Sequence, residues 1–423
     1  MKKKKVLVLG GGGREHALCW KLSQSHKVDQ LFCIPGNAGI QELAQTDASI
    51  SLVDFPAIKQ FALQHQIELI VVGPEQMLVM GIKDYFEDSN IQVFGPDRHS
   101  AQLEGSKIFT KNFFSKFDIP TPSFKTFFTL DDALYHIHTH KEYPIVIKAD
   151  GLASGKGVII AHSEEDAVNS IKEMMEHKKF KSAGDKIIIE EYIEGPEISY
   201  QVILDGSHFI ELQVSQDFKK AYEQNLGPNT GGMGNLCPPS WADASILQQG
   251  KEMIVKKIAQ YLPREGINFN GVLFTGMIMS KSGLKALEIN VRFGDPELQT
   301  ILPLLKTDLM DLIESCHEHT LDQLKLEWEK LYSSCVVLCS EGYPDKELSL
   351  DHEIHGLAEA QAMEGVLVFH AGTQLQNGKL VNHGGRVLNV IGLGKTTEEA
   401  SRKAYSAIAK ISFKGMSFRK DIR

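Results

Sequence analysis

The sequence predicts a multidomain protein of mixed α/β and α+β class, with a parallel-sheet domain first, an α+β domain next and a mostly-β domain last. The length of 423 residues, at roughly 150 residues per domain, suggests about three domains. Short apolar runs alternate with amphipathic helical stretches at the start of the chain, whereas strand-like runs separated by polar turns prevail near its end. A hydrophobic content of 42% is enough to bury several cores.

The first domain is predicted from apolar runs typical of parallel strands: VLVLG, QLFCIP, LIVVGP and IQVFGP. The segments between them have the pattern of amphipathic helices that wrap such a sheet. We therefore predict a Rossmann-like domain over residues 1–103. Ligands of these sheets bind beyond the carboxyl ends of the strands, so the loops that follow the runs are the expected substrate site.

The second domain is predicted over residues 104–328, because the breaker IPTPSF follows the helical segment SAQLEGSKIFTKNFFSKF. Strand-like runs such as YPIVIKA and KIIIEEYI, around one clear helix, predict a small mobile subdomain at about 124–192. The runs CVVLCSEGYP, GVLVFHAGT and RVLNVIGLG predict a mostly-β domain over residues 329–423. Its last helix, TTEEASRKAYSAIAKI, starts with residues typical of an N-cap.

Composition excludes several classes of function. The 54 acidic and 45 basic residues give a formal charge of -9, which disfavours a nucleic-acid partner because phosphate backbones repel an acidic surface. The six cysteines include no CxxC pair and are too sparse for a disulfide framework. No apolar run is long enough for a signal peptide or a membrane span. We expect a soluble, cytoplasmic protein with small-molecule substrates and no membrane partner.

Three glycine-bearing loops follow the first three predicted strands and should converge on one rim. In the first, Gly10–Gly13 opens a helix, so its backbone amides can cradle an anion. The dinucleotide spacing GxGxxG fails at Glu15, and no acidic residue ends the next strand. A phosphate on a small substrate is the preferred ligand, and an ordinary tight turn is the alternative. The candidate residues are Gly11, Gly12, Gly13, Arg14, Gly36, Asn37, Gly73, Pro74 and Glu75.

The stretch KADGLASGKGV, Lys148–Val158, carries a lysine at a strand end and a second lysine in a loop of small residues. Such a loop can cover a triphosphate. It differs from a P-loop, because only three residues separate Gly151 from Gly155 and a glycine follows Lys156. A plain β-hairpin is the alternative.

In KALEINVRFGDPE, strand alternation places Glu288, Asn290 and Arg292 on one face of a strand. A carboxylate and an amide oxygen beside an arginine suit Mg²⁺, which takes few protein oxygens and keeps those of its phosphates. A solvated outer face would show the same alternation. The pattern HIHTH has no completing cysteine or acid and lies in a helical pattern, so we expect no metal there. The loop GPNTGGMG, Gly227–Gly234, can approach a ligand closely through its backbone.

Together these motifs resemble the phosphoribosylamine–glycine ligase family of the ATP-grasp superfamily over essentially the whole chain. The carrying strings are GGGGREHAL, GNAG, GPE, QLEGSK, KADGLASGKGV, SQD, GPNTGGMG, NVRFGDPE and HGGRVLNV, of which NVRFGDPE with GPNTGGMG is the most specific. The chain departs from the family pattern at Phe218, where histidine is usual, and at His383, where serine is usual. Another ATP-grasp ligase or carboxylase of purine synthesis is the alternative.

The resemblance implies that ATP phosphorylates glycine and that the amine of 5-phosphoribosylamine attacks the glycyl phosphate, giving glycinamide ribonucleotide, ADP and phosphate in purine synthesis. It implies an ATP-grasp domain with a mobile lid, and ATP with Mg²⁺, or Mn²⁺ in its place. No catalytic serine or cysteine is required. Transient contact with the preceding enzyme of the pathway, which makes the unstable amine, is a further expectation.

The resemblance also assigns roles to residues. Lys107 and Lys148 would contact the ATP phosphates, and Arg292 would steady the transferred phosphoryl group. The other residues assigned to the nucleotide are Gly155, Lys156 and Gly157 in the covering loop, Glu190, Glu191 and Ile193 at adenine, and Glu197 at the ribose. Glu288 and Asn290 would bind the metal. The residues assigned to the substrates beside the N-terminal loops are Asp217, Asn229, Gly231 and Asp295, the last also as a catalytic residue.

Overall fold

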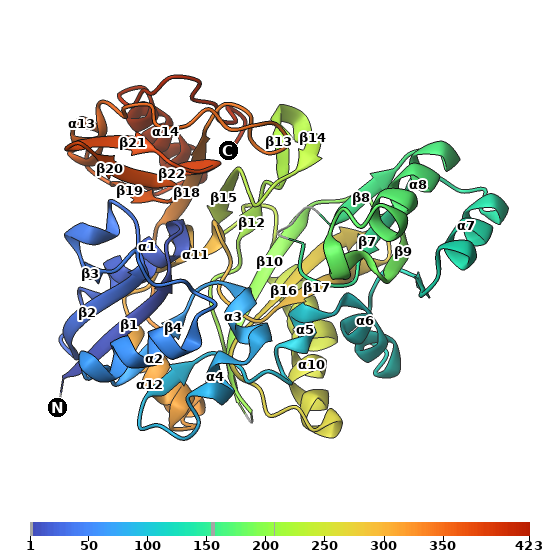
Figure 1. Cartoon of the computed structure of the whole chain (residues 1–423), viewed down its shortest axis with the longest axis horizontal. Coiled ribbons are helices and arrows are strands. Elements are labelled where there is room, and N and C mark those ends of the chain that lie inside the picture. The colour runs from blue at the N-terminus through green and yellow to red at the C-terminus, as the bar shows by residue number, and fades with distance from the viewer. Residues whose placement is uncertain (1–2, 154–156, 207) are drawn as a thin grey trace.

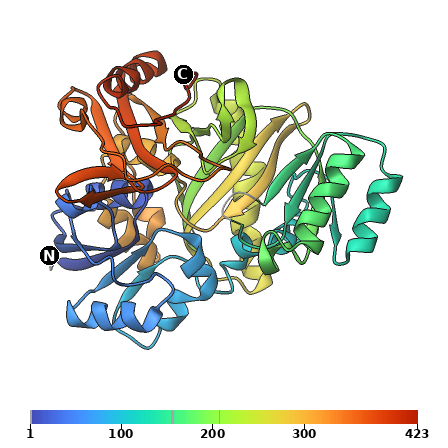
Figure 2. The same cartoon turned by 45° about the horizontal axis from the view of Figure 1, so that its top comes forward.

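The structure of the protein is a computed structural model, which describes residues 3–153, 157–206 and 208–423. In Figure 1 the N-terminal body lies at the lower left and the C-terminal body above it, while a lobe formed by α7, α8 and β6 to β9 projects to the right. A long antiparallel sheet lies between them, and Figure 2 shows the same arrangement from a second side. No helix in these ranges is long and apolar enough to cross a membrane.

The N-terminal body contains the expected parallel sheet, with strand order β3-β2-β1-β4-β5. Alternation along β1 sends Leu7 and Leu9 into one core, with α2 to α4, and Val6 and Val8 into another, with α1. The elements are β1 (Lys4–Gly10), α1 (Gly13–Leu22), β2 (Val28–Pro35), β3 (Gln45–Thr46), α2 (Phe55–Gln64), β4 (Leu69–Val72), α3 (Glu75–Met80), α4 (Ile82–Tyr85) and β5 (Gln92–Phe94).

The expected helical segment after the first domain forms two helices, α5 (Gln102–Gly105) and α6 (Lys107–Lys116). They divide at Ser106, which has extended backbone angles and whose hydroxyl caps α6 by accepting a hydrogen bond from the Phe109 amide. The same hydroxyl donates to Asp150, 2.8 Å away. This contact ties the start of α6, and with it Lys107, to the end of β7 in the next subdomain.

We use the name lid subdomain for residues 124–153 and 157–191, which form the projecting lobe of Figure 1. Its four strands pair in the order β6-β9-β7-β8, and both helices bury their apolar faces in a separate core around Ile137, Ile147 and Ile171. The subdomain therefore has a hydrophobic core separate from those of the other parts. Its elements are β6 (Phe124–Phe127), α7 (Leu130–Thr139), β7 (Ile145–Ala149), β8 (Val158–Ala161), α8 (Glu164–Ile171) and β9 (Ile187–Glu191).

The central sheet has the order β11-β10-β16-β17 and is antiparallel. Its apolar residues join the core of the N-terminal body, so the two parts are packed together. The elements are β10 (Glu197–Asp205), β11 (Phe209–Glu211), α9 (Ala244–Gly250), α10 (Lys256–Tyr261), β16 (Asn270–Ser280), β17 (Gly283–Asn290), α11 (Glu297–Ile301) and α12 (Leu309–His317).

The C-terminal body is built on an antiparallel sheet with the order β12-β15-β18-β22-β19. Two of these strands, β12 (Gln216–Asp217) and β15 (Gly234–Cys237), come from the middle of the chain and enclose the hairpin β13 (Lys220–Tyr222) and β14 (Leu226–Asn229). As predicted, a threonine, Thr396, caps the last helix. The remaining elements are β18 (Tyr332–Cys339), α13 (Leu357–Gln361), β19 (Val366–His370), β20 (Thr373–Gln376), β21 (Lys379–Asn382), β22 (Arg386–Gly394) and α14 (Thr397–Ile408).

Candidate active site

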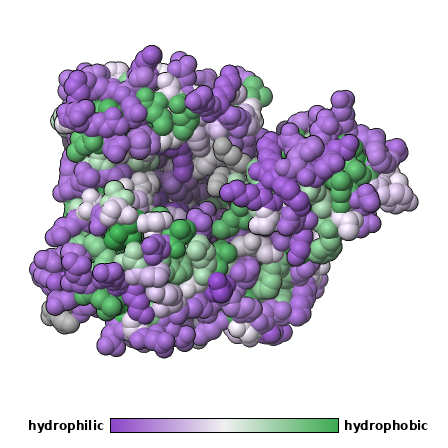
Figure 3. Space-filling model, in the orientation of Figure 1, coloured by the Kyte–Doolittle hydropathy of each residue, from purple (hydrophilic) through white to green (hydrophobic). Residues whose placement is uncertain are grey.

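A cavity of about 800 Å³ lies where the lid subdomain, the central sheet and the segment 216–231 meet. Figure 3 shows the molecule hollowed between the projecting lobe and the two bodies on the left, with hydrophilic residues around the opening. The volume is in the range of small-molecule sites and suits a ligand of nucleotide size. Charged side chains from distant parts of the sequence share its walls: Glu75, Glu104, Lys107, Lys111, Lys148, Glu190, Glu197, Asp217, Lys219, Glu288, Arg292 and Glu297.

Most of the residues predicted for the nucleotide and the metal line this one cavity. The predicted residues in its walls are Glu75, Lys107, Lys148, Gly157, Glu190, Glu191, Ile193, Glu197, Asp217, Asn229, Gly231, Glu288, Asn290, Arg292 and Asp295. Gly155 and Lys156 lie outside the described residues. Within the described chain, Gly11, Gly12, Gly13, Arg14, Gly36, Asn37, Gly73 and Pro74 are outside these walls.

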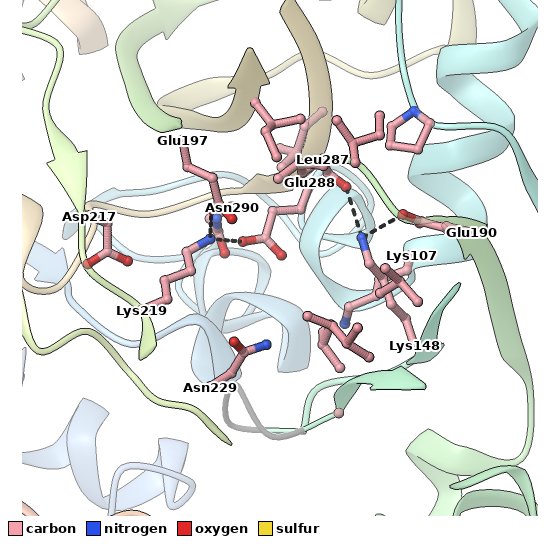
Figure 4. A pocket seen from close by; sticks show the side chains of 18 of the residues that line it. Lys107, Lys148, Glu190, Glu197, Asp217, Lys219, Asn229, Leu287, Glu288 and Asn290 are labelled. Carbon is pink, nitrogen blue, oxygen red and sulfur yellow. Dashed lines mark hydrogen bonds and ion pairs between the residues drawn. The ribbon is translucent and has the colours of Figure 1, made fainter. Parts of the chain in front are cut away.

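Two lysines share one buried carboxylate at the lid side of the cavity. The Glu190 carboxylate lies 2.9 Å from Lys148 Nζ and 3.1 Å from Lys111 Nζ, and Figure 4 shows Lys148 directed at Glu190 and at the Leu287 carbonyl. Burial, reinforced by repulsion from Lys148, lowers the pKa of Lys111 from 10.5 to about 8. Burial also lowers the pKa of Lys107. Lys107 and Lys111 both lie near Lys148, so this side of the cavity carries a cluster of cationic side chains that suits a polyanion.

A second cluster lies on the opposite side, around strand β17. Figure 4 shows Lys219 between Glu197 and Glu288, and its Nζ is 3.1 Å from the first carboxylate and 3.3 Å from the second. Attraction by Lys219, joined by Lys148 and Lys107, lowers the pKa of Glu288 to about 2 despite its burial. Glu288 is therefore ionised at neutral pH and faces several cations.

These residues fit a magnesium ion that shares its ligands with phosphates. Glu288 and Asn290 both line the cavity, as strand alternation requires, and both offer oxygens. The Glu288 carboxylate already attracts an ammonium group, which shows that a cation is favoured at this point. No group of three or more His, Cys, Asp or Glu able to hold a metal occurs in the described parts of the chain. Mg²⁺ bound with phosphates takes few protein oxygens, and the two side chains that line the cavity here match that requirement.

Arg292 is held rigidly at the floor of the cavity. Its guanidinium contacts Glu75 at 3.2 Å and Glu104 at 3.0 Å and donates to the Asn290 side-chain oxygen at 3.2 Å. Burial raises the pKa of Glu104 to about 7, while attraction by Arg292 lowers that of Glu75 to about 2 although burial opposes it. An arginine fixed in this way is preorganised to meet a charge that develops nearby.

Asp217 and Glu297 are neighbouring acidic residues in the wall at the far end of the cavity. Desolvation and repulsion by Glu297 raise the pKa of Asp217 well above its ordinary value. The Asp217 Oδ1 atom is buried without a hydrogen-bond partner in the described structure, whereas Glu297 accepts from Ser199 at 2.9 Å. An unpartnered buried acceptor is costly, and a bound amine would satisfy it.

Asp295 connects this end to the C-terminal body. It lies 2.8 Å from the Arg386 guanidinium, which also donates to the Gly231 carbonyl at 2.6 Å. Attraction by Arg386 lowers the pKa of Asp295 against the effect of burial. Strand β22 therefore takes part in fixing both Asp295 and the glycine-rich loop.

The N-terminal glycine loops meet at the carboxyl edge of their sheet, as expected. The Gly36 amide donates to the Gly10 carbonyl at 3.2 Å, and Asn37 donates to the Gly11 carbonyl at 2.9 Å. A Cβ on Gly11 would lie 2.5 Å from the Gly36 carbonyl oxygen, so only glycine allows this approach. The third loop reaches the main cavity through Glu75, and Arg14 of the first loop donates to the Phe293 carbonyl, next to Arg292, at 3.1 Å.

Two features of these loops were not predicted. The Gly12 amide is taken by the Glu15 carboxylate at 2.7 Å, so it is not free to bind an anion. His370 of the C-terminal body covers the second loop and accepts, through its carbonyl, a hydrogen bond of 2.8 Å from Asn37. The rim is therefore formed by both end domains of the chain.

Sequence reasoning missed Glu104, Lys111, Lys219, Glu297 and Arg386. Lys111 follows Lys107 by one helical turn and Lys219 follows Asp217 by two residues of extended chain, so periodicity could have found both. Glu104, Glu297 and Arg386 lie in the motifs QLEGSK, FGDPE and HGGRVLNV, but only the fold shows which of their side chains reach the site.

Comparison with known proteins agrees with this architecture. Family models for phosphoribosylglycinamide synthetase match the chain in three parts: the N domain over residues 4–104, the ATP-grasp (A) domain over 105–298 and the C domain over 333–423. The solved structure of phosphoribosylamine–glycine ligase from Thermotoga maritima has a TM-score of 0.85 and 32% identity, and the match covers 99% of this chain and 100% of that one.

Curated relatives extend the match over the whole chain. Phosphoribosylamine–glycine ligase of Caldanaerobacter subterraneus subsp. tengcongensis is 46% identical over 420 residues, 99% of each chain. The enzyme of Escherichia coli strain K12 is 42% identical over 421 residues, 99% of this chain and 97% of that one. The chain therefore belongs to the phosphoribosylamine–glycine ligase family of the ATP-grasp ligases, which use ATP with Mg²⁺.

Proposed function

We propose that the 800 Å³ cavity is where this enzyme carries out its reaction. The chain is an ATP-dependent ligase that joins glycine to 5-phosphoribosylamine in purine biosynthesis, giving glycinamide ribonucleotide, ADP and phosphate. The observation that carries the proposal is the meeting of Lys107, Lys148, Glu288 and Asn290, which come from separate segments, in the same walls.

The nucleotide would lie between the lid subdomain and strand β17. In this proposal Lys107 and Lys148 neutralise the phosphates, Ile193 and its neighbours Glu190 and Glu191 hold adenine, mainly by backbone, and Glu197 binds the ribose. The loop with Gly155, Lys156 and Gly157 would cover the phosphates and exclude water. When bound through Glu288 and Asn290, Mg²⁺, or Mn²⁺ in its place, would supply positive charge between the phosphates.

Phosphoryl transfer depends on positioning and charge neutralisation, so this chain needs no nucleophile of its own. A carboxylate oxygen of glycine attacks the γ-phosphorus, the bond to ADP breaks, and glycyl phosphate forms. Arg292, held by Glu75 and Glu104, stabilises the charge on the transferred group. The amine of phosphoribosylamine then attacks the glycyl carbon, phosphate leaves, and the new amide loses a proton.

Glycine would be oriented by the acidic end of the cavity. Its ammonium group matches the unpartnered Asp217 oxygen and the neighbouring Glu297. Asp295 and the loop with Asn229 and Gly231, which Arg386 holds in place, would enclose its carboxylate side.

Phosphoribosylamine would enter from the N-terminal rim, with its 5′-phosphate at the loops of Gly11, Gly12, Gly13, Arg14, Gly36, Asn37, Gly73 and Pro74. The link from Arg14 to Phe293 supports this, because it joins the rim to the segment after β17 that carries Arg292. Since the amide of Gly12 is occupied by Glu15, the other groups of these loops would provide the contacts.

We also propose a cytoplasmic location and transient contact with the enzyme that makes the unstable amine. The six cysteines are buried free thiols, which suits a reducing compartment. The proposed functional division is residues 1–103 for phosphoribosylamine, 104–328 for ATP and glycine, with the lid at about 124–192, and 329–423 as the closing domain.

The proposal is tested by Mg²⁺-dependent ADP release with glycine, phosphoribosylamine or both present. We expect full turnover only with both, and a loss of at least about a hundredfold in Glu288→Ala, because one metal ligand is removed. Glu252→Gln, which changes an exposed carboxylate, is the control. Undiminished turnover without glycine, or full activity of Glu288→Ala, would contradict the proposal.

A further inference from the structure

The hairpin β13–β14 forms one wall of the cavity, but only a few hydrogen bonds between its own strands stabilise it. It and its flanks contribute Lys219, Lys220, Gln224, Asn225 and Asn229 to the lining. Its strands are short, their register is irregular, and the tip residues Gln224 and Asn225 have φ angles of 59° and 56°, in the left-handed region. Isolated two-stranded hairpins are marginally stable, so another element must hold this one in place.

The end of the chain supplies that support through Arg419, whose side chain is buried with 2% exposure. Its guanidinium donates to the Lys220 carbonyl at 3.1 Å and to the Asn225 side-chain oxygen at 3.0 Å. It also lies 5.1 Å from the centre of the Phe218 ring, a cation–π contact. One side chain therefore contacts the beginning and the tip of the hairpin at once.

Asp421 completes the contact. Its carboxylate accepts two hydrogen bonds from Arg419, at 2.8 and 2.7 Å, and a third at 2.8 Å from the Gln224 amide. Paired in this bidentate way, the two charges fix each other in orientation as well as in position. Asp421 thereby supplies a hydrogen-bond acceptor for the amide of Gln224, whose φ angle lies in the left-handed region.

The terminus is itself anchored to the C-terminal body. Tyr405 of helix α14 donates to the Arg419 carbonyl at 2.9 Å and accepts from the Ile422 amide at 3.1 Å. Ile422 is fully buried in the core that contains Phe218. The terminus is thus a fixed point against which the hairpin is held.

The hairpin in turn places Lys219, which precedes it. The Lys219 carbonyl accepts hydrogen bonds from the Thr230 amide and hydroxyl, both at 2.8 Å, and its Nζ pairs with Glu197 and Glu288 as in Figure 4. We propose that Arg419 and Asp421 are positioning residues of the active site, which act through the hairpin to hold Lys219 against the nucleotide-binding carboxylates. This inference rests on the proposed function of the cavity.

The test compares Arg419→Ala, Arg419→Lys and Asp421→Asn with Lys420→Ala, which changes the exposed residue between them. In Arg419→Ala we expect kcat/KM for ATP to fall by roughly tenfold to a hundredfold, because displacements of about 1 Å have such effects. The KM for ATP should rise while that for phosphoribosylamine stays the same. Arg419→Lys, which lacks the planar fork, should recover only part of the loss, and Lys420→Ala should match the wild type.

Amide hydrogen exchange separates positioning from simple destabilisation. We expect faster exchange in residues 219–230 and unchanged exchange in β16 of the central sheet. Two outcomes would overturn the inference. One is a fall in kcat with both KM values unchanged and faster amide exchange in β16 as well as in residues 219–230. The other is unchanged kinetics although amide exchange in residues 219–230 is faster. If Arg419→Ala fails to fold, Asp421→Asn gives the same contrast with little change in volume. Full activity of Glu288→Ala would instead reject the proposed function of the cavity.

Discussion

Replacing Glu190 with glutamine removes the negative charge that two buried lysines share. Glu190 and Lys111 are each 2% exposed and Lys148 is 6% exposed, so water cannot replace the lost partner. Removing one member of a buried ion pair costs roughly 3–5 kcal/mol. Glutamine keeps one oxygen that can accept a hydrogen bond, and Lys111, with its pKa already lowered to about 8, can release its proton. Both effects place the loss near the lower end, at about 3 kcal/mol.

Thermal unfolding of the Glu190→Gln protein measures this loss. A domain of roughly 150–250 residues loses about 2–4 °C in its unfolding temperature per kcal/mol, so the unfolding temperature of the variant should fall by roughly 6–12 °C at pH 7. The difference from the wild type should narrow at pH 9, because Lys111 is then largely neutral in both proteins. Glu252→Gln, which breaks an exposed pair with Lys256, should change the transition by no more than about 2 °C. A transition of Glu190→Gln within 2 °C of the wild type would refute the reasoning.

Further perturbations test other parts of the site. In Lys219→Met the pKa of Glu288, lowered to about 2 chiefly by Lys219, should rise, so the acid limb of the pH–rate profile should move to higher pH; an unmoved limb would show that the pair is not functional. Asp217→Asn should raise the KM for glycine roughly tenfold to a hundredfold, as expected for a lost charged hydrogen bond, and leave that for ATP unchanged; equal changes in both would reject an ammonium site. The pKa of Lys111 is about 8 in the folded protein and 10.5 ordinarily, so between these pH values the unfolded chain binds the proton that the folded protein has released. The free energy of unfolding should therefore rise from pH 8 to pH 10.5 in the wild type. Urea unfolding of Lys111→Met should lack this rise.

Local patterns were sufficient to predict the elements that carry much of the site. The alternation in KALEINVRF places Glu288 and Asn290 on the cavity side of β17 because neighbouring side chains of a strand point to opposite faces. The glycine loops converge because the carboxyl ends of β1, β2 and β4 lie at one edge of a parallel sheet. The lid subdomain and the cap of α14 were also expected from short segments alone.

Contacts between distant segments could not be predicted in this way. No local pattern indicates that β12 and β15 extend the C-terminal sheet, or that Arg386 reaches Asp295. The shared counter-charge of Lys111 and Lys148 likewise depends on the packing of α6 against β9. The sequence also could not show that two of the predicted ligand-binding groups already have partners within the protein. The Glu190 carboxylate pairs with Lys148, and the Gly12 amide donates to Glu15.

Transfer of ¹⁸O from the carboxyl group of glycine is the most direct test of the central claim, that glycyl phosphate forms in this cavity. In the proposed reaction one glycine oxygen becomes bonded to the transferred phosphorus and leaves with it when the amine attacks. We therefore predict that each phosphate released by the wild-type enzyme carries one labelled oxygen. In Glu288→Ala we expect neither labelled phosphate nor ADP to be formed at an appreciable rate. Release of unlabelled phosphate during full turnover would contradict the account.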